Sequence, residues 1–176
     1  MTAAEHLNVV KLSYGAARTI GREARTSMSD GKETGGILLG DYGGDGSVRV
    51  RFAGTPGPHA IRRHDFFLRD LEHTRVYAEQ CYRHYGVAWV GEWHTHPVHA
   101  PIPSPRDLAT YDALSTDPEL DFSHDFLALI AAPSSDAGGR WVLAAWACRG
   151  WACRPLVVEQ PSATDQEPPT QKAPAP

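Results

Sequence analysis

The chain of 176 residues lacks the features that mark secreted, membrane-spanning or cysteine-rich metal-binding proteins. Its three cysteines show no repeated Cys-x-x-Cys spacing, which indicates neither a disulfide framework nor a cysteine-rich zinc site. No apolar run approaches the roughly 20 residues that a membrane helix needs, and the first residues lack the basic and then apolar layout of a signal peptide. These absences favour a protein of the reducing cytoplasm without a membrane partner.

Lysine is also scarce, since it occurs at only three positions and the basic charge is nearly all arginine, and the formal net charge is −4. This balance excludes the strongly basic surface that nucleic-acid-binding proteins use. A small basic cluster, Arg62, Arg63 and His64, is interpreted as a solvated loop or as a contact for an acidic partner tail. We expect one domain over residues 1–159, followed by a disordered, proline-rich tail over residues 160–176.

Hydrophobic periodicity and turn residues predict a mixed α/β chain with the element order β-α-β-β-α-β-α-β-β. Strands are expected over residues 7–13, 34–42, 47–54, 87–96, 125–133 and 140–150, with residues 151–159 as a candidate for one more, and helices over residues 14–28, 64–86 and 104–114. The clearest helix carries an apolar stripe from Phe67 to Tyr85, with Asp65 as its N-cap and Gly86 in the left-handed position after its end. The pattern indicates a sheet flanked by two long helices, with a short third helix.

Small and aromatic residues of the last strands are interpreted as core residues. Cys148 and Cys153 match no standard metal or redox spacing, so they are expected to be small apolar strand residues. Trp141, Trp146 and Trp151 lie on adjacent predicted strands and are expected to pack in the core or to line a groove for an extended peptide.

The segment "GEWHTHPVHAPIPSPRD" (91–107) concentrates residues that can bind a metal. On a strand, alternate side chains share a face, so Glu92, His94 and His96 point the same way. Pro97 ends the strand, and Asp107 begins the next helix, from which its carboxylate can supply a third ligand. Three protein ligands with a fourth position left for water is the arrangement of a catalytic zinc site.

Helix capping is the alternative explanation for part of this motif. In "SPRD", Ser104 suits the N-cap, proline the first helical position, and Asp107 the third. Capping alone accounts for Ser104 and Asp107 without a metal. The two interpretations are compatible, because a capped helix start holds its acidic residue rigidly.

A hydrolytic zinc site also needs a general base, since a carboxylate must accept the proton of the attacking water. Glu92 and Glu33 are the two candidates. Glu92 shares the face of the histidines, whereas Glu33 begins "ETGGILLG", where paired glycines permit close approach of the backbone. Spacing alone slightly favours Glu92 and leaves both open.

"HTHPVHAPIPSPRD" resembles the His-x-His-Pro, spacer, Ser-x-x-Asp signature of the JAB/MPN+ (JAMM) metallopeptidases, and "ETGGILLG" resembles the strand that carries their catalytic glutamate. The resemblance covers about residues 7–150 and implies a cytidine-deaminase-like α/β fold.

The resemblance also assigns roles. It implies that His94, His96 and Asp107 bind Zn²⁺, that Glu33 is the general base, and that the Ser104 hydroxyl helps to hold the tetrahedral intermediate. Glu92 stands where many members carry an aromatic residue, so it is expected to compete as base or to support the ligands from outside the metal's coordination sphere. His99 is expected in the spacer loop near the substrate channel.

Short segments such as "TPGPHAIRRHDFFLRD" and "GEWHTHP" resemble bacterial members that include the deconjugating peptidases of CBASS antiphage operons. The implied substrate is a cGAS-like nucleotidyltransferase whose extended C-terminal tail is attached to lysines by an E1/E2-like partner. Such a tail would lie beside a sheet edge. Two alternatives stay open: processing of a ubiquitin-like or sulfur-carrier precursor, and a non-catalytic interaction module.

Overall fold

The computed structural model describes residues 6–120, 122, 124–135 and 139–161. Its elements are β1 (Val9–Leu12), α1 (Tyr14–Asp30), β2 (Gly35–Tyr42), β3 (Ser47–Ala53), β4 (Ile61–Arg63), β5 (Phe66–Leu68), α2 (Leu71–Tyr85), β6 (Ala88–Thr95), α3 (Pro105–Ser115), β7 (Phe126–Pro133), β8 (Trp141–Arg149) and β9 (Ala152–Glu159). The predicted mixed α/β order is confirmed, with β4 and β5 added as a short hairpin. Most of the predicted tail lies outside the described residues.

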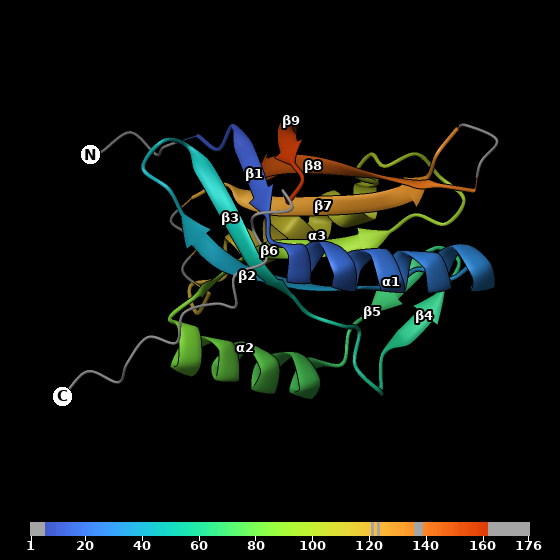
Figure 1. The fold of residues 1–176 in the computed structure, drawn as a ribbon, viewed down its shortest axis with the longest axis horizontal. Helices are drawn as coiled ribbons and strands as arrows, with labels where there is room; N and C mark the ends of the chain where they lie inside the picture. Colours follow the sequence, from blue (N-terminus) through green and yellow to red (C-terminus); the bar gives the residue numbers. More distant parts are fainter. Residues whose placement is uncertain (1–5, 121, 123, 136–138, 162–176) are drawn as a thin grey trace.

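Seven strands form a closed, mixed sheet in the order β1-β3-β2-β6-β7-β8-β9 (Figure 1). β1 runs parallel to both β3 and β9, which closes the barrel, and β6 runs parallel to β7. The remaining neighbours of this sheet are antiparallel. β6 therefore lies in the interior of the sheet, between β2 and β7, where its backbone is paired on both sides.

Alternate side chains of the central strands face different helices. Leu38 of β2 packs with Ile20 of α1, whereas its neighbours Ile37 and Leu39 pack with Cys81 of α2. A third cluster joins α3 to β7 and β8 through Tyr111, Phe126, Ala128 and Cys148. The period-2 pattern of the strands thus explains why three helices can cover one sheet.

The predicted second helix was too long at its start. Residues 61–68 form the β4–β5 hairpin, in which Ile61 pairs with Leu68, and α2 begins only at Leu71. Asp70, not Asp65, is the N-cap and accepts a hydrogen bond from the His73 backbone N–H at 3.1 Å. Apolar side chains in the hairpin continued the spacing of the helix, so periodicity could not separate the two elements. The C-terminal Gly86 has φ 66°, as predicted.

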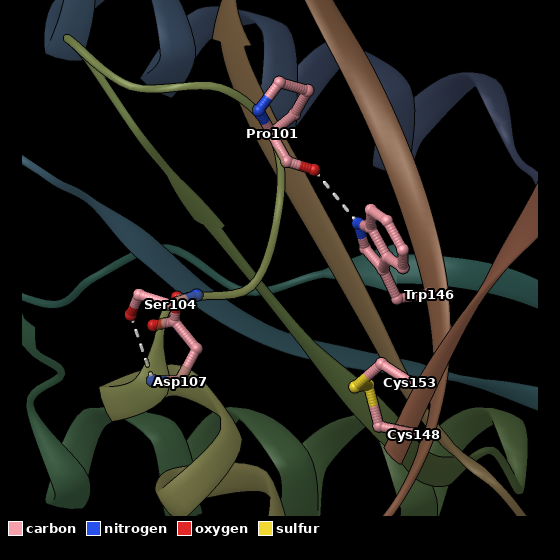
Figure 2. Close-up of a disulfide and its surroundings, with 6 residues drawn as sticks. All are labelled: Pro101, Ser104, Asp107, Trp146, Cys148 and Cys153. Atoms are coloured by element: carbon pink, nitrogen blue, oxygen red, sulfur yellow. Dashed lines mark hydrogen bonds between the residues drawn. A yellow bond between two sulfur atoms is a disulfide. The ribbon is translucent and has the colours of Figure 1, made fainter. Parts of the chain in front are cut away.

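The interpretation of Cys148 and Cys153 as unlinked strand residues was wrong. The two side chains form a disulfide between β8 and β9 (Figure 2). They lie directly opposite each other in the antiparallel register, with Cα atoms 4.1 Å apart, because the hairpin turns at Gly150. The turn also leaves Trp151 60% exposed, so this tryptophan is not a core residue.

In the described part of the chain, no helix combines the length and the apolar character that crossing a membrane requires.

Candidate metal centre

Three side chains from two elements converge on one point. His94 lies near the end of β6, His96 follows just beyond the strand, and Asp107 lies in the first turn of α3. The Nε2 atoms of His94 and His96 are 3.0 Å apart, and each lies 3.3–3.4 Å from a carboxylate oxygen of Asp107. The structure thus brings together the three residues that the sequence predicted as metal ligands.

The central position of β6 holds the two histidines in place. His94 pairs with Gly35 of β2 and with Ile130 of β7, and the His96 backbone N–H donates to the Ala131 carbonyl at 2.8 Å. Gly35 is required here, because a side chain at this position would collide with the Trp93 backbone carbonyl and with the His94 Cβ. The glycine pair of "ETGGILLG" therefore allows β2 to approach the histidine strand closely.

The start of α3 confirms the capping interpretation. The Asp107 backbone N–H donates to Ser104 Oγ at 3.2 Å, and the Ser104 backbone N–H donates to Asp107 Oδ2 at 2.7 Å (Figure 2). The cap coexists with the convergence on the histidines, so capping and metal binding are not exclusive. The Ser104 side chain also helps to lower the pKa of Asp107 by hydrogen bonding.

Contacts within the cluster shift the pKa values of Asp107 and His96. Burial alone would raise the pKa of Asp107, but contacts with the His94 and His96 rings hold it well below its usual range. For His96, burial acts to lower the pKa, yet the partners Asp107 and the Ala100 carbonyl raise it overall. The site therefore combines a carboxylate whose pKa is lowered with the His96 imidazole, whose pKa is raised.

The same geometry fits Zn²⁺. Two imidazole nitrogens 3.0 Å apart repel unless a proton or a cation lies between them. His96 Nδ1 lies 2.9 Å from the Ala100 carbonyl, which makes Nδ1 the protonated nitrogen and leaves the Nε2 lone pair for a metal. Two imidazole nitrogens and a carboxylate oxygen form a donor set that zinc accepts in catalytic sites.

Glu33 lies immediately before β2, within electrostatic reach of the cluster. Its pKa is raised to about 7, mainly by burial; His96 and Arg106 act to lower the pKa, and the charges of Asp107 and Asp65 act to raise it. Thr95, between the two histidines, binds the neighbouring Thr34 twice: its N–H donates to the Thr34 carbonyl at 2.9 Å, and its Oγ1 accepts from the Thr34 N–H at 3.0 Å. The fold thus ties the Glu33 segment to the histidine strand.

Glu92 is engaged elsewhere. Its carboxylate forms an ion pair with Arg69, and both side chains are largely buried. Arg69, whose pKa is lowered to about 10 by burial, also lies over the Trp89 ring at 5.9 Å. Although Glu92 shares a strand face with the histidines, its carboxylate is therefore occupied by the ion pair with Arg69. The sequence analysis did not predict this role of Arg69, because the residue follows a short hairpin and belongs to no recognisable motif or hydrophobic pattern.

His99 lies in the loop after Pro97, as predicted. Its ring stands edge-on to the His96 ring with centroids 6.4 Å apart, and the residue is exposed. The loop is fastened to the sheet at Pro101, whose carbonyl accepts a hydrogen bond from Trp146 Nε1 at 3.0 Å (Figure 2). Trp146 therefore supports the loop between the histidines and Asp107.

Residues 16–148 match the family model Prok-JAB, described as prokaryotic homologs of the JAB domain. The chain belongs to this family. The resemblance found in the sequence is thereby confirmed at the level of the family, and the three helices on a mixed sheet agree with a JAB-like fold.

One curated relative is a "CD-NTase/cGAS isopeptidase" from Enterobacter hormaechei subsp. hoffmannii (strain UCI 50). It is 27% identical over 114 residues, which cover 64% of this chain and 61% of that protein. The match thus spans less than two thirds of the relative's length. It confirms the resemblance to the CBASS-associated members of the family.

Among solved structures, the chain is similar to protein DSY2949 from Desulfitobacterium hafniense. The TM-score is 0.62 at 16% sequence identity, with 86% of this chain and 92% of that chain covered. At this identity the likeness supports the fold alone.

Proposed function

We propose that this protein is a zinc-dependent isopeptidase that cleaves the bond after the C-terminus of a conjugated, cGAS-like nucleotidyltransferase. The observation that carries the proposal is the convergence of His94, His96 and Asp107, with Glu33 in electrostatic reach. The name of the Enterobacter relative supports the reaction class and the substrate.

In this proposal His94, His96 and Asp107 hold the ion. Zinc supplies Lewis acidity, which polarises a carbonyl oxygen and makes water acidic enough to be a nucleophile near neutral pH. Glu33 accepts the proton of the attacking water, and a pKa near 7 keeps the carboxyl poised for both accepting and returning it. The Ser104 hydroxyl donates to the oxyanion that develops at the scissile carbonyl.

The partners follow from the same proposal. The substrate presents an extended C-terminal tail, and an E1/E2-like partner of the same operon forms the bond that this enzyme cleaves, in a cytoplasmic antiviral defence system. Glu92 acts through its ion pair with Arg69, which fixes the strand next to His94. His99 lies where the tail would enter the site.

The test uses the full-length protein and a nucleotidyltransferase of this class fused after its last residue to a fluorescent protein. We expect about one bound zinc per chain by elemental analysis, cleavage at the fusion junction, and loss of cleavage with a chelator. Glu33→Gln should keep zinc and lose cleavage, and His94→Ala should lose both. The matched control is His84→Ala, an exposed histidine at the end of α2, which should keep both.

Three results would contradict the proposal. Cleavage that survives metal removal, or a Glu33→Gln variant at full rate, would exclude the proposed chemistry. Absence of cleavage with zinc bound would favour a non-catalytic module. Cleavage of a ubiquitin-like precursor in place of the nucleotidyltransferase fusion would favour the processing alternative.

A further inference from the structure

Arg62 of β4 lies outside the metal cluster but binds the segment that carries Glu33. Its Nε donates to the Glu33 carbonyl at 3.1 Å, and its Nη2 donates to the Lys32 carbonyl at 3.2 Å. The other face of the guanidinium forms a two-point ion pair with Asp30, at 2.9 and 3.2 Å. One side chain therefore satisfies two backbone carbonyls and links them to the last residue of α1.

The first residue of this segment is also bound to the end of α1: the Lys32 carbonyl accepts from Ser27 Oγ at 2.6 Å, and the Lys32 N–H donates to Asp30 Oδ1 at 3.0 Å. Residues 32–34 belong to no helix or strand, and Figure 1 shows the β4–β5 hairpin beside the C-terminal end of α1. The Glu33 N–H donates to the Arg63 carbonyl at 2.7 Å. Thr34 is bound to Thr95 on the inner side, as described above. Glu33 thus lies between the histidine strand and the hairpin, and both of its backbone polar groups bind β4: its N–H binds the Arg63 carbonyl, and its carbonyl binds the Arg62 side chain.

The β4–β5 hairpin is bound to both α3 and β6. Arg106, in the first turn of α3, donates to the Asp65 carbonyl at 2.7 Å. Arg69, directly after β5, is paired with Glu92 of β6. The element that holds the Glu33 segment is therefore joined to both elements that carry the metal-binding side chains.

Resting on the proposed function, we infer that Arg62 is a positioning residue that sets the place of the Glu33 carboxylate relative to the metal cluster. The planar guanidinium suits this role because it presents several donors in a fixed geometry, which a lysine ammonium cannot reproduce. Its side chain is only 22% exposed, whereas Arg63 and His64 are exposed. The interpretation of all three residues as a solvated loop was therefore wrong for Arg62.

The role predicts a specific kinetic effect. Without the guanidinium, the Glu33 carbonyl loses its hydrogen bond from Arg62, whereas the Lys32 carbonyl still accepts from Ser27 Oγ at 2.6 Å. Glu33 can then move, and a displacement of about 1 Å can cost roughly 100-fold in rate. The cluster of His94, His96 and Asp107 should stay intact, since the Arg62 hydrogen bonds go to Asp30 and to the backbone carbonyls of residues 32 and 33. We therefore expect kcat to fall while zinc content and KM stay unchanged.

The test compares Arg62→Ala, Arg62→Lys and the control Arg63→Ala, with the same nucleotidyltransferase fusion. Arg63→Ala removes an equal charge from the same hairpin but leaves the backbone carbonyl that binds Glu33. Arg62→Ala should lower kcat about 10- to 100-fold with KM within about twofold, and Arg62→Lys should recover part of the loss. Arg63→Ala should behave as the wild type.

Hydrogen exchange provides a readout that does not depend on activity. The Glu33 and Thr34 amides should exchange faster in Arg62→Ala than in Arg63→Ala, because the segment is released. If Arg62→Ala does not fold, Asp30→Asn carries the comparison: a lower kcat at an unchanged melting temperature supports the inference, and an unchanged kcat overturns it.

The two proposals fail in different ways. Full activity in Glu33→Gln would overturn the proposed function whatever Arg62 does. Loss of activity in Glu33→Gln, together with wild-type kcat and wild-type exchange in Arg62→Ala, would overturn the positioning role alone.

Discussion

Ser104 is the residue at which a structural and a chemical role overlap. Its Oγ caps α3, and in the proposed function its hydroxyl donates to the oxyanion. The same overlap holds for Asp107, which accepts from the Ser104 N–H while its carboxylate contacts both histidines. The capped helix start therefore also fixes the carboxylate that we propose as the third metal ligand.

Two substitutions separate the roles of Ser104. Ser104→Ala should lower the free energy of unfolding by about 1 kcal/mol, whereas Ser104→Gly should lower it by only a few tenths, because glycine is a tolerated N-cap. Both remove the hydroxyl donor, so both should lower kcat roughly 100- to 1,000-fold. Denaturant unfolding and steady-state kinetics measure the two effects. A near wild-type kcat in Ser104→Gly would assign Ser104 to capping alone.

The pH dependence of the reaction should report Glu33. Burial raises its pKa to about 7, and only the deprotonated carboxylate can accept a proton, so kcat/KM should rise with pH and level off above the pKa. A bound cation would lower this pKa, which places the midpoint at or below 7 in the zinc-loaded enzyme. The residual rate of Glu33→Gln should not show this rise of kcat/KM on the acid side of the pH profile, which is called the acid limb. An unchanged acid limb in that variant would assign it to another group.

At the scale of elements, β2 and β6 determine how closely Glu33 and the histidines approach. The pairing of Gly35 with His94 places the start of β2 beside the ligand-bearing end of β6. Because there is no space for a Cβ at Gly35, the distance between these two strands is part of the site.

Gly35→Ala tests this contact. The added methyl group would collide with the Trp93 carbonyl and lie 2.9 Å from the His94 Cβ, so it should destabilise the fold by about 1–3 kcal/mol and lower zinc occupancy. Gly44→Ala is the matched control, because a Cβ added at Gly44 would have no neighbouring atom within 4 Å. Thermal unfolding and elemental analysis measure the outcome. Equal zinc occupancy in the two variants would show that His94 does not depend on this close approach.

At the scale of the whole molecule, the buried Asp125 carboxylate links strands on both sides of the β1–β9 pairing that closes the barrel. Asp125 precedes β7 and accepts from Arg149 Nε and Arg154 Nη2, both at 3.0 Å, on β8 and β9. Its Oδ2 also lies 3.4 Å from the Leu7 N–H, just before β1. Asp125 therefore connects the strands on both sides of the β1–β9 closure.

Asp125→Asn should destabilise the protein by about 1–3 kcal/mol at neutral pH. Burial raises the pKa of Asp125, but hydrogen bonds and charge from Arg149 and Arg154 lower it overall. A depressed pKa contributes stability above the unfolded-state value of about 3.9, and this contribution is lost as the pH falls through the folded-state value. The difference between wild type and Asp125→Asn should therefore shrink below about pH 4.

Denaturant unfolding over a pH series measures this difference. The control is Asp41→Asn, which removes a half-exposed carboxylate from a 3.5 Å ion pair on β2 and should have little effect. A constant difference across the acid range would contradict the assignment to the Asp125 charge.

The sequence by itself determined the local features of this protein. Ser104 caps α3 as predicted, Gly86 ends α2, and the alternation of side chains on β6 places His94 and His96 on one face. These features depend on residues a few positions apart, whose geometry is set by backbone sterics and hydrogen bonding within one segment.

Only the tertiary structure decided which distant groups meet. It pairs Glu92 with Arg69, binds the Glu33 segment to Arg62, and joins Cys148 to Cys153 across a hairpin. It also replaces the predicted start of α2 with the β4–β5 hairpin. Such contacts depend on strand register and on which faces of separate elements pack together, and neither composition nor spacing within a segment carries that information.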